Sequence, residues 1–259
     1  MKVLIIIPAY NEEKRIGNTL KEYSSYFENL RSTKFDYEIL VVINATTDKT
    51  EEIVKGFKKK FKRINYLNFK EAGKGFAVKQ GFIYGIKKNF DLIGFVDADM
   101  ATSPAAFYDL IKNINDYDGI IASRYVKNAK VFPKPTLQRI IVSRVFNFLV
   151  RVLFLMPYKD TQCGAKLFKK EIVKVFVKNA GLTNWAFDVD LLYIAKKNNY
   201  IIKENPTIWR DKEGSRLNLK KASLQMFFAV VQLKILNSKA KIFYKILKPI
   251  GGFIYNKLK

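Results

Sequence analysis

The chain has 259 residues, 49% hydrophobic and 27% charged, and its 47 basic and 23 acidic residues give a net charge of +24 at pH 7. This is the composition of a folded protein, long enough for one large domain. The single cysteine excludes an intramolecular disulfide framework and is typical of a reducing compartment. Because the chain has no histidine, Ser-His-Asp catalysis and histidine-ligated zinc are excluded, and any metal must bind oxygen ligands.

Strand and helix patterns alternate through the first part of the chain. Apolar runs predict strands at 3–7, 37–43, 64–69, 92–96 and 119–122, and the stretches between them predict helices at 12–30, 50–61, 75–86 and 103–114. Ser103 can cap the last of these helices, and Pro104 suits its first position. Repeated strand–helix units with fully apolar strands predict an α/β fold with a mostly parallel, doubly wound sheet.

A longer amphipathic helix is predicted from Thr136, its cap, to about Met156. Most of its positions are apolar, but four polar residues recur at every fourth position and form one stripe: Arg139, Ser143, Asn147 and Arg151. Such a helix can lie in the lipid interface with the polar stripe toward the active site, or it can be a buried helix with one wetted edge. Its arginines make a transmembrane span too costly.

The basic residues are concentrated in two regions. Between Asp118 and Asp160, and again after Glu213, the chain has no acidic residue, yet both regions are rich in basic and apolar side chains. This combination favours contact with an anionic membrane surface, although a solvated basic face is the simpler alternative. Nucleic acid is not an expected partner, because the aromatic residues alternate with aliphatic ones along helices.

The predicted domains follow from these patterns. We expect a catalytic domain over residues 1–216, which includes the helix at about 136–156, and basic amphipathic membrane-associating helices over 217–259. The final segment could instead pack on the catalytic domain. No transmembrane span is predicted, and the expected location is the cytoplasmic face of a membrane.

Polar motifs come directly after the predicted strands, where open parallel sheets bind ligands. Asp97-Ala98-Asp99 comes directly after the fourth strand, and two carboxylates so placed can share a divalent cation that binds a diphosphate. A pair of turn-capping residues is the simpler interpretation of such a motif when it stands alone.

The motif does not stand alone. The other motifs are Pro8-Ala9-Tyr10-Asn11-Glu12, Gly73-Lys74-Gly75, Ser123-Arg124-Tyr125, Asp160-Thr161-Gln162-Cys163-Gly164 and Trp185-Ala186-Phe187-Asp188-Val189-Asp190. Together they resemble the family 2 glycosyltransferases, which have the GT-A fold, and within them the dolichyl-phosphate sugar synthases. The resemblance covers about residues 3–217. It is stronger to the glucose than to the mannose enzymes, because Ala101 stands where the mannose synthases commonly carry Gln.

The resemblance implies roles for the residues that match. The catalytic residues would be Asp97, Asp99 and Arg124, and the ligands of Mg²⁺ or Mn²⁺ would be Asp99 and Asp97. The resemblance leaves the roles of Asp188 and Asp190 open, and Asp190 is a further candidate catalytic residue. The nucleotide sugar would contact Pro8, Tyr10, Glu12, Asn44, Asp48, Lys74 and Asp97. The acceptor phosphate is expected at Arg124, Arg139, Ser143, Asn147 and Arg216. The family's usual acidic pair after the second strand is replaced by Ile43-Asn44, which leaves the choice of base open.

The expected function is therefore inverting transfer of a hexose from a nucleotide sugar, UDP-glucose in preference to GDP-mannose, to a polyprenyl or dolichyl phosphate. A phosphate with a second pKa of about 6 is already largely ionised at pH 7 and needs no histidine base. Transfer to a glycan or lipid hydroxyl is the alternative, with Asp190 as the base. A second alternative is a non-catalytic, basic membrane-binding protein with the same fold.

Overall fold

The computed structural model describes residues 1–32, 35–181, 186–210 and 219–238. Within these residues, seven strands form one sheet in the order β3-β2-β1-β4-β7-β5-β8, and only β7 runs antiparallel to its neighbours. The strands are β1 (Lys2–Ala9), β2 (Asp36–Asn44), β3 (Ile64–Phe69), β4 (Leu92–Phe95), β5 (Gly119–Ser123), β7 (Lys166–Lys169) and β8 (Ile202–Pro206). The predicted doubly wound, mostly parallel sheet is confirmed.

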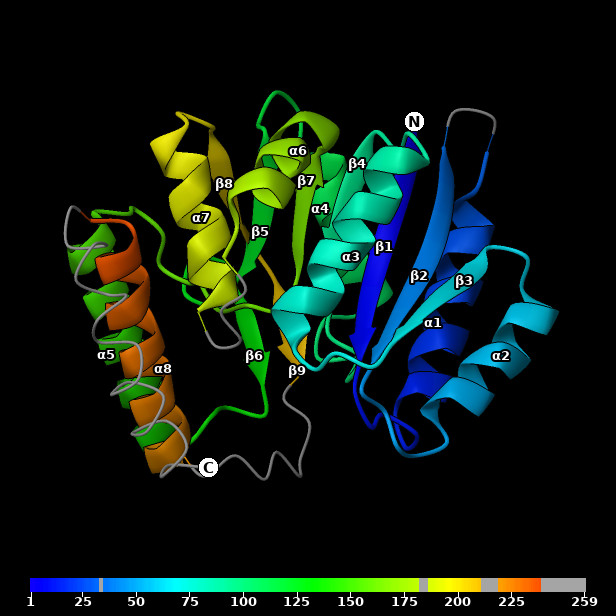
Figure 1. Ribbon diagram of the computed structural model, residues 1–259, viewed down its shortest axis with the longest axis horizontal. Helices are drawn as coiled ribbons and strands as arrows, with labels where there is room; N and C mark the ends of the chain where they lie inside the picture. The colour runs from blue at the N-terminus through cyan, green and yellow to red at the C-terminus, as the bar shows by residue number, and fades with distance from the viewer. Residues whose placement is uncertain (33–34, 182–185, 211–218, 239–259) are drawn as a thin grey trace.

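Helices cover both faces of this sheet (Figure 1). One face packs on α1 (Ile16–Leu30), α2 (Thr50–Lys60) and α4 (Pro104–Asn113). The other packs on α3 (Lys74–Lys87), α6 (Lys170–Asn179) and α7 (Phe187–Lys197). The apolar strands are buried on both faces because they lie between the two helical layers. Gly81 allows α3 to lie close to β1, since a Cβ atom there would be 2.7 Å from the side chain of Ile6.

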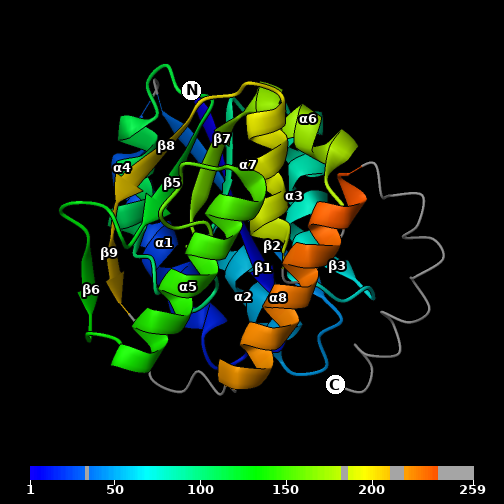
Figure 2. The same cartoon turned by 90° about the vertical axis from the view of Figure 1, so that its left-hand side faces the viewer.

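Two further helices stand side by side beyond α7, as Figure 2 shows: α5 (Leu137–Phe154) and α8 (Leu219–Leu236). Thr136 caps α5 as predicted, by accepting a hydrogen bond from the Arg139 N–H. A small parallel sheet of β6 (Lys130–Phe132) and β9 (Ile208–Arg210) completes the described elements. None of the helices in these residues is long and apolar enough to cross a bilayer. Of the membrane-associating helices expected over 217–259, residues 217–218 and 239–259 lie outside the described residues.

Two details differ from the sequence prediction. Helix α1 begins at Ile16 instead of Glu12, because the preceding residues anchor the loop: the Glu12 and Glu13 N–H groups donate to the side chains of Thr50 and Asp48. The predicted sheet ended with β5, whereas the structure inserts the antiparallel strand β7 between β4 and β5. This insertion brings the motif Asp160–Gly164 beside Asp97.

Candidate active site

The site lies at the carboxyl ends of β1, β2 and β4, which are neighbours in the sheet and end at its lower edge in Figure 1. The loops after these strands carry the motifs singled out in the sequence. Asp97 and Asp99 come just after β4, and Lys74 is the first residue of α3. Parallel strands therefore gather residues from distant parts of the chain into one site, as open α/β sheets do.

The two aspartates form a charged, half-buried pair. The Asp99 carboxylate accepts a hydrogen bond from the Ala101 N–H at 2.9 Å. Burial, and then the negative charge of Asp97, raise the pKa of Asp99 above its ordinary value. The repulsion between two neighbouring carboxylates is relieved by a cation. The Lys74 ammonium supplies part of that charge, since it lies 2.7 Å from Asp97 Oδ1.

This donor set fits a divalent metal held jointly by protein and substrate. No cluster of three or more His, Cys, Asp or Glu side chains suited to a metal occurs among the described residues. Asp97 and Asp99 would thus supply only part of a coordination shell. Mg²⁺ and similar hard cations commonly bind through one or two carboxylates, with substrate phosphates and waters as the other ligands. The pair therefore fits a metal that binds together with a nucleotide diphosphate.

Behind Asp97 lies a chain of buried charges. Lys74 is 3.8 Å from Asp188 Oδ2, and the fully buried Lys166 ammonium is 2.6 Å from Asp188 Oδ1. Burial opposes the charge of Asp188, but Lys166 and then Lys74 lower its pKa below the ordinary value. Sequence reasoning left the role of Asp188 open and gave none to Lys166. The only signal that could have pointed to them was their position, Asp188 within the Trp185–Asp190 motif and Lys166 two residues after the Asp160–Gly164 motif.

The predicted nucleotide-binding residues line the β1 and β2 loops, but several also support those loops. Tyr10 is 55% exposed and open to a ligand. Glu12 forms a two-point ion pair with Arg15 at 2.6 and 2.7 Å. Burial opposes ionisation of Asp48, but hydrogen bonds from the Thr50 hydroxyl and from the N–H groups of Thr50 and Glu13 lower its pKa below the ordinary value. Direct contact of Glu12 and Asp48 with a nucleotide stays a prediction.

Asn44 is nearly completely buried. With its amide oriented to satisfy both neighbours, it donates to the Ala9 carbonyl and accepts from the Gly73 N–H, each at 3.0 Å. It therefore joins the end of β1 to the loop that carries Lys74. The structure gives Asn44 this supporting position, and its predicted contact with the nucleotide stays a prediction. Pro8, near the end of β1, is half-buried.

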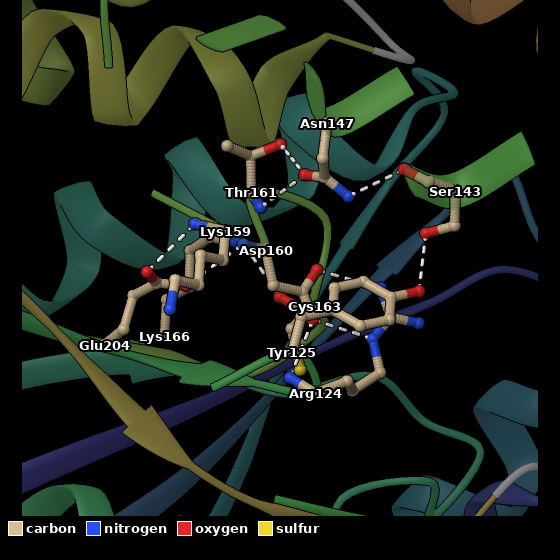
Figure 3. Close-up of polar contacts among 10 residues, drawn as sticks. All are labelled: Arg124, Tyr125, Ser143, Asn147, Lys159, Asp160, Thr161, Cys163, Lys166 and Glu204. Carbon is tan, nitrogen blue, oxygen red and sulfur yellow. Dashed lines mark hydrogen bonds and ion pairs between the residues drawn. The ribbon is translucent and has the colours of Figure 1, made fainter. Parts of the chain in front are cut away.

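A largely buried ion pair lies in the region where the acceptor phosphate was expected (Figure 3). Arg124 holds the fully buried Asp160 carboxylate through Nε at 2.8 Å and Nη2 at 2.9 Å, and its guanidinium lies over the Trp209 ring. Burial opposes ionisation of Asp160, but Arg124 lowers its pKa below the ordinary value. Two guanidinium nitrogens of Arg124 therefore already donate to Asp160, and its predicted contact with phosphate stays a prediction.

Only the middle of the polar stripe of α5 faces inward, where it contacts protein, whereas Arg151 at its end is exposed. The Tyr125 hydroxyl donates to Ser143 Oγ at 2.6 Å, and Asn147 Oδ1 accepts from the N–H and hydroxyl of Thr161 (Figure 3). Arg139 is half-buried in the first turn. The predicted acceptor residue Arg216 lies outside the described residues.

Asp190 lies apart from this chain of contacts, in the first turn of α7. Its carboxylate is buried and accepts a hydrogen bond from the Gly181 N–H at 2.8 Å. Burial raises the pKa of Asp190 to about 6, which the Gly181 hydrogen bond and the charge of Lys79 only partly offset.

Comparison with known proteins identifies the family. The profile described as Glycosyl transferase family 2 matches residues 4–176. The chain belongs to this glycosyltransferase family. Among its curated relatives, the dolichyl-phosphate beta-glucosyltransferase of Dictyostelium discoideum is 32% identical over 241 residues, which cover 89% of this chain and 73% of the relative. The enzyme of the same name from Homo sapiens is 31% identical over 225 residues, covering 82% and 68%.

Solved structures confirm the GT-A fold of this family 2 glycosyltransferase. Glucosyl-3-phosphoglycerate synthase from Mycobacterium tuberculosis, in complex with Mn²⁺, UDP and glucosyl-3-phosphoglycerate, aligns with a TM-score of 0.65 at 15% identity, over 90% of this chain and 79% of that one. A mannosyltransferase from Pyrobaculum calidifontis, in complex with GDP-Man and Mn²⁺, aligns with a TM-score of 0.63 at 17% identity, over 96% and 68%.

Proposed function

We propose that this glycosyltransferase moves a glucosyl group from UDP-glucose to a polyprenyl phosphate at a membrane surface, with Mg²⁺ or Mn²⁺ bound at Asp97 and Asp99. The acceptor and sugar are those named for relatives that are about one third identical over most of the chain. The observation that carries the proposal is helix α5, whose inner face holds the loops of the site and whose outer face is apolar and exposed.

The outer face of α5 has the character of an interfacial helix. Seven large apolar side chains are more than one third exposed, and they extend from the first turn of the helix to its C-cap: Leu137, Ile141, Val142, Val145, Phe148, Val152 and Leu155. The segment from Gly119 to Lys159, which includes α5, has no acidic residue, while Arg144 and Arg151 add positive charge to the helix. An apolar face flanked by arginine suits the boundary of an anionic leaflet, which supports a position on the cytoplasmic face.

The residues present suit an acceptor that is already charged. The chain has no histidine, and a phosphate monoester with a pKa of about 6 needs no base at pH 7. When bound, the metal would neutralise the departing nucleotide diphosphate. Asp97 and Asp99 would hold the metal ion in place, and Lys74 brings a further positive group to the same point. A single in-line displacement inverts the anomeric centre, so an α-linked nucleotide sugar gives a β-linked lipid phosphate.

Transfer to a hydroxyl group is the second candidate, and Asp190 is the observation that favours it. A carboxylate with a pKa near 6 can act as a general base close to neutral pH. A hydroxyl acceptor needs such a base, whereas a phosphate acceptor does not. Asp190→Asn therefore separates the two candidates.

The test is transfer of labelled sugar from UDP-glucose or GDP-mannose to a detergent-dispersed polyprenyl phosphate, with and without Mn²⁺. We expect a chloroform-soluble product from UDP-glucose that requires the metal. Asp99→Asn should abolish it, while Asp109→Asn, which removes an exposed carboxylate paired with Lys112, serves as the matched control. A lipid product that forms equally well with Asp99→Asn contradicts the metal site, and its absence with every donor contradicts the phosphate acceptor.

A further inference from the structure

Asn147 ties helix α5 to the segment Asp160–Gly164. Its Oδ1 accepts from Thr161 N at 3.0 Å and from Thr161 Oγ1 at 3.1 Å, and its Nδ2 donates to the Ser143 carbonyl at 3.0 Å. Asn147 is 3% exposed and Thr161 fully buried. Because a buried donor that loses its acceptor is strongly penalised, Thr161 is held where Asn147 puts it.

The other end of the same segment forms a wall of the metal site. A Cβ atom placed on Gly164 would overlap the carboxylate of Asp97. The preceding carbonyl, that of Cys163, accepts from the Lys166 ammonium at 2.7 Å. On its other side, Asp97 contacts Lys74. The carboxylate is thus confined between Lys74 and the Gly164 backbone, and a shift of Asp160–Gly164 changes the space that it can occupy.

Helix α5 is held by a seam of few fully buried residues, and α8 packs along it. Its buried residues are Asn147, Val150 and Phe154, whereas its outer face is exposed along its whole length. An element with few buried contacts opens at a lower free-energy cost than the core. Whatever covers the outer face of α5 will therefore restrict the motion of Asn147.

We propose that Asn147 is a positioning residue for Asp97, and that it couples the docking of α5 on a lipid surface to the binding of metal and nucleotide. The inference rests on the proposed function, because it takes Asp97 as a metal ligand and lipid as the partner of α5. The coupling acts through Thr161 and Gly164. Such coupling is reciprocal: if lipid tightens nucleotide binding by some factor, the nucleotide tightens lipid binding by the same factor.

The test measures the dissociation constant of UDP in the presence of Mn²⁺ by titration calorimetry, with and without vesicles that contain phosphatidylglycerol. Asn147→Leu keeps the branched shape of the side chain but leaves Thr161 without its acceptor. We expect it to weaken UDP–Mn²⁺ binding roughly 5- to 30-fold and to abolish the tightening that vesicles cause in the natural protein. Val150→Ala is the matched control: it loosens the same seam but keeps the Asn147 contacts, so the affinity and the vesicle effect should persist.

Further variants keep the result decisive. Thr161→Val removes one of the two hydrogen bonds to Asn147 with little change in shape, so it should show a smaller loss in the same direction even if Asn147→Leu does not fold. Equal weakening by Thr161→Val and Val150→Ala would mean loosened packing and would overturn the coupling, as would unchanged affinity in Asn147→Leu. Asp99→Asn tests the proposed function separately: UDP–Mn²⁺ binding that survives this change contradicts the metal site itself.

Discussion

Asp190 carries the sharpest quantitative prediction, through Asp190→Asn. Burial raises the pKa of this carboxyl from 3.8 to about 6 in the folded protein. The folded state therefore keeps the proton to a higher pH than the unfolded chain. The favourable effect of the neutral acid is fully present below about pH 4 and is lost as pH rises through 6. Because the two pKa values differ by about two units, the free energy of unfolding at pH 7 is about 3 kcal/mol lower than it would be with the acid neutral in both states.

Asparagine retains an oxygen for the Gly181 N–H but cannot ionise. Relative to the natural protein, Asp190→Asn should gain about 2 kcal/mol of stability between pH 4 and pH 7, whatever constant cost the amide adds. Urea unfolding at the two pH values measures this difference. A stability difference that does not change with pH would refute the buried, raised carboxyl. Sugar transfer by the same variant has a second use: activity should persist with a phosphate acceptor and disappear if Asp190 is the base for a hydroxyl.

Three further predictions concern the site and its surroundings. Gly164→Ala should weaken UDP–Mn²⁺ binding roughly tenfold or more in a titration, because the added methyl group displaces Asp97 at a cost of about 1–3 kcal/mol. Its control is Gly56→Ala, which lies in open space on α2 and should stabilise the protein against unfolding by about 0.5–1 kcal/mol. Asp160→Ala should cost about 3–5 kcal/mol in urea unfolding, since it leaves the largely buried Arg124 guanidinium without its partner, and a smaller loss would mean that water reaches this pair. Sedimentation with anionic vesicles should fall as salt is raised, and binding that ignores salt would contradict the electrostatic part of membrane docking.

The central sheet and the place of the Asp97–Asp99 pair could be predicted because their signals are local. The strand Val3–Ile7 is a continuous apolar run, and such a run indicates burial on both faces. Ser103 and Thr136 cap their helices as predicted, because a capping hydrogen bond reaches only three residues along the chain. Asp97 and Asp99 were found because the residues just after a parallel strand lie at the ligand-binding edge of the sheet.

The partners of the buried charges could not be predicted in this way. Lys166 pairs with Asp188 across 22 positions, and Arg124 with Asp160 across 36. Arg124 and the polar stripe of α5 were expected to bind a phosphate, whereas in the structure Arg124 pairs with Asp160 and Asn147 accepts a hydrogen bond from Thr161. Each of these side chains has the same character in the sequence whether it binds a ligand or a neighbour.

The sequence by itself thus determined the α/β architecture, the strand-end motifs and the amphipathic character of α5, since these depend on the order of residues within a few turns. Only the tertiary structure decided which polar groups meet. The antiparallel strand β7 enters between β4 and β5, and this crossing sets Gly164 against Asp97 and Thr161 against Asn147. The physical reason is that a hydrogen bond or ion pair forms between groups that the path of the whole chain brings together, and that path is not encoded near either residue.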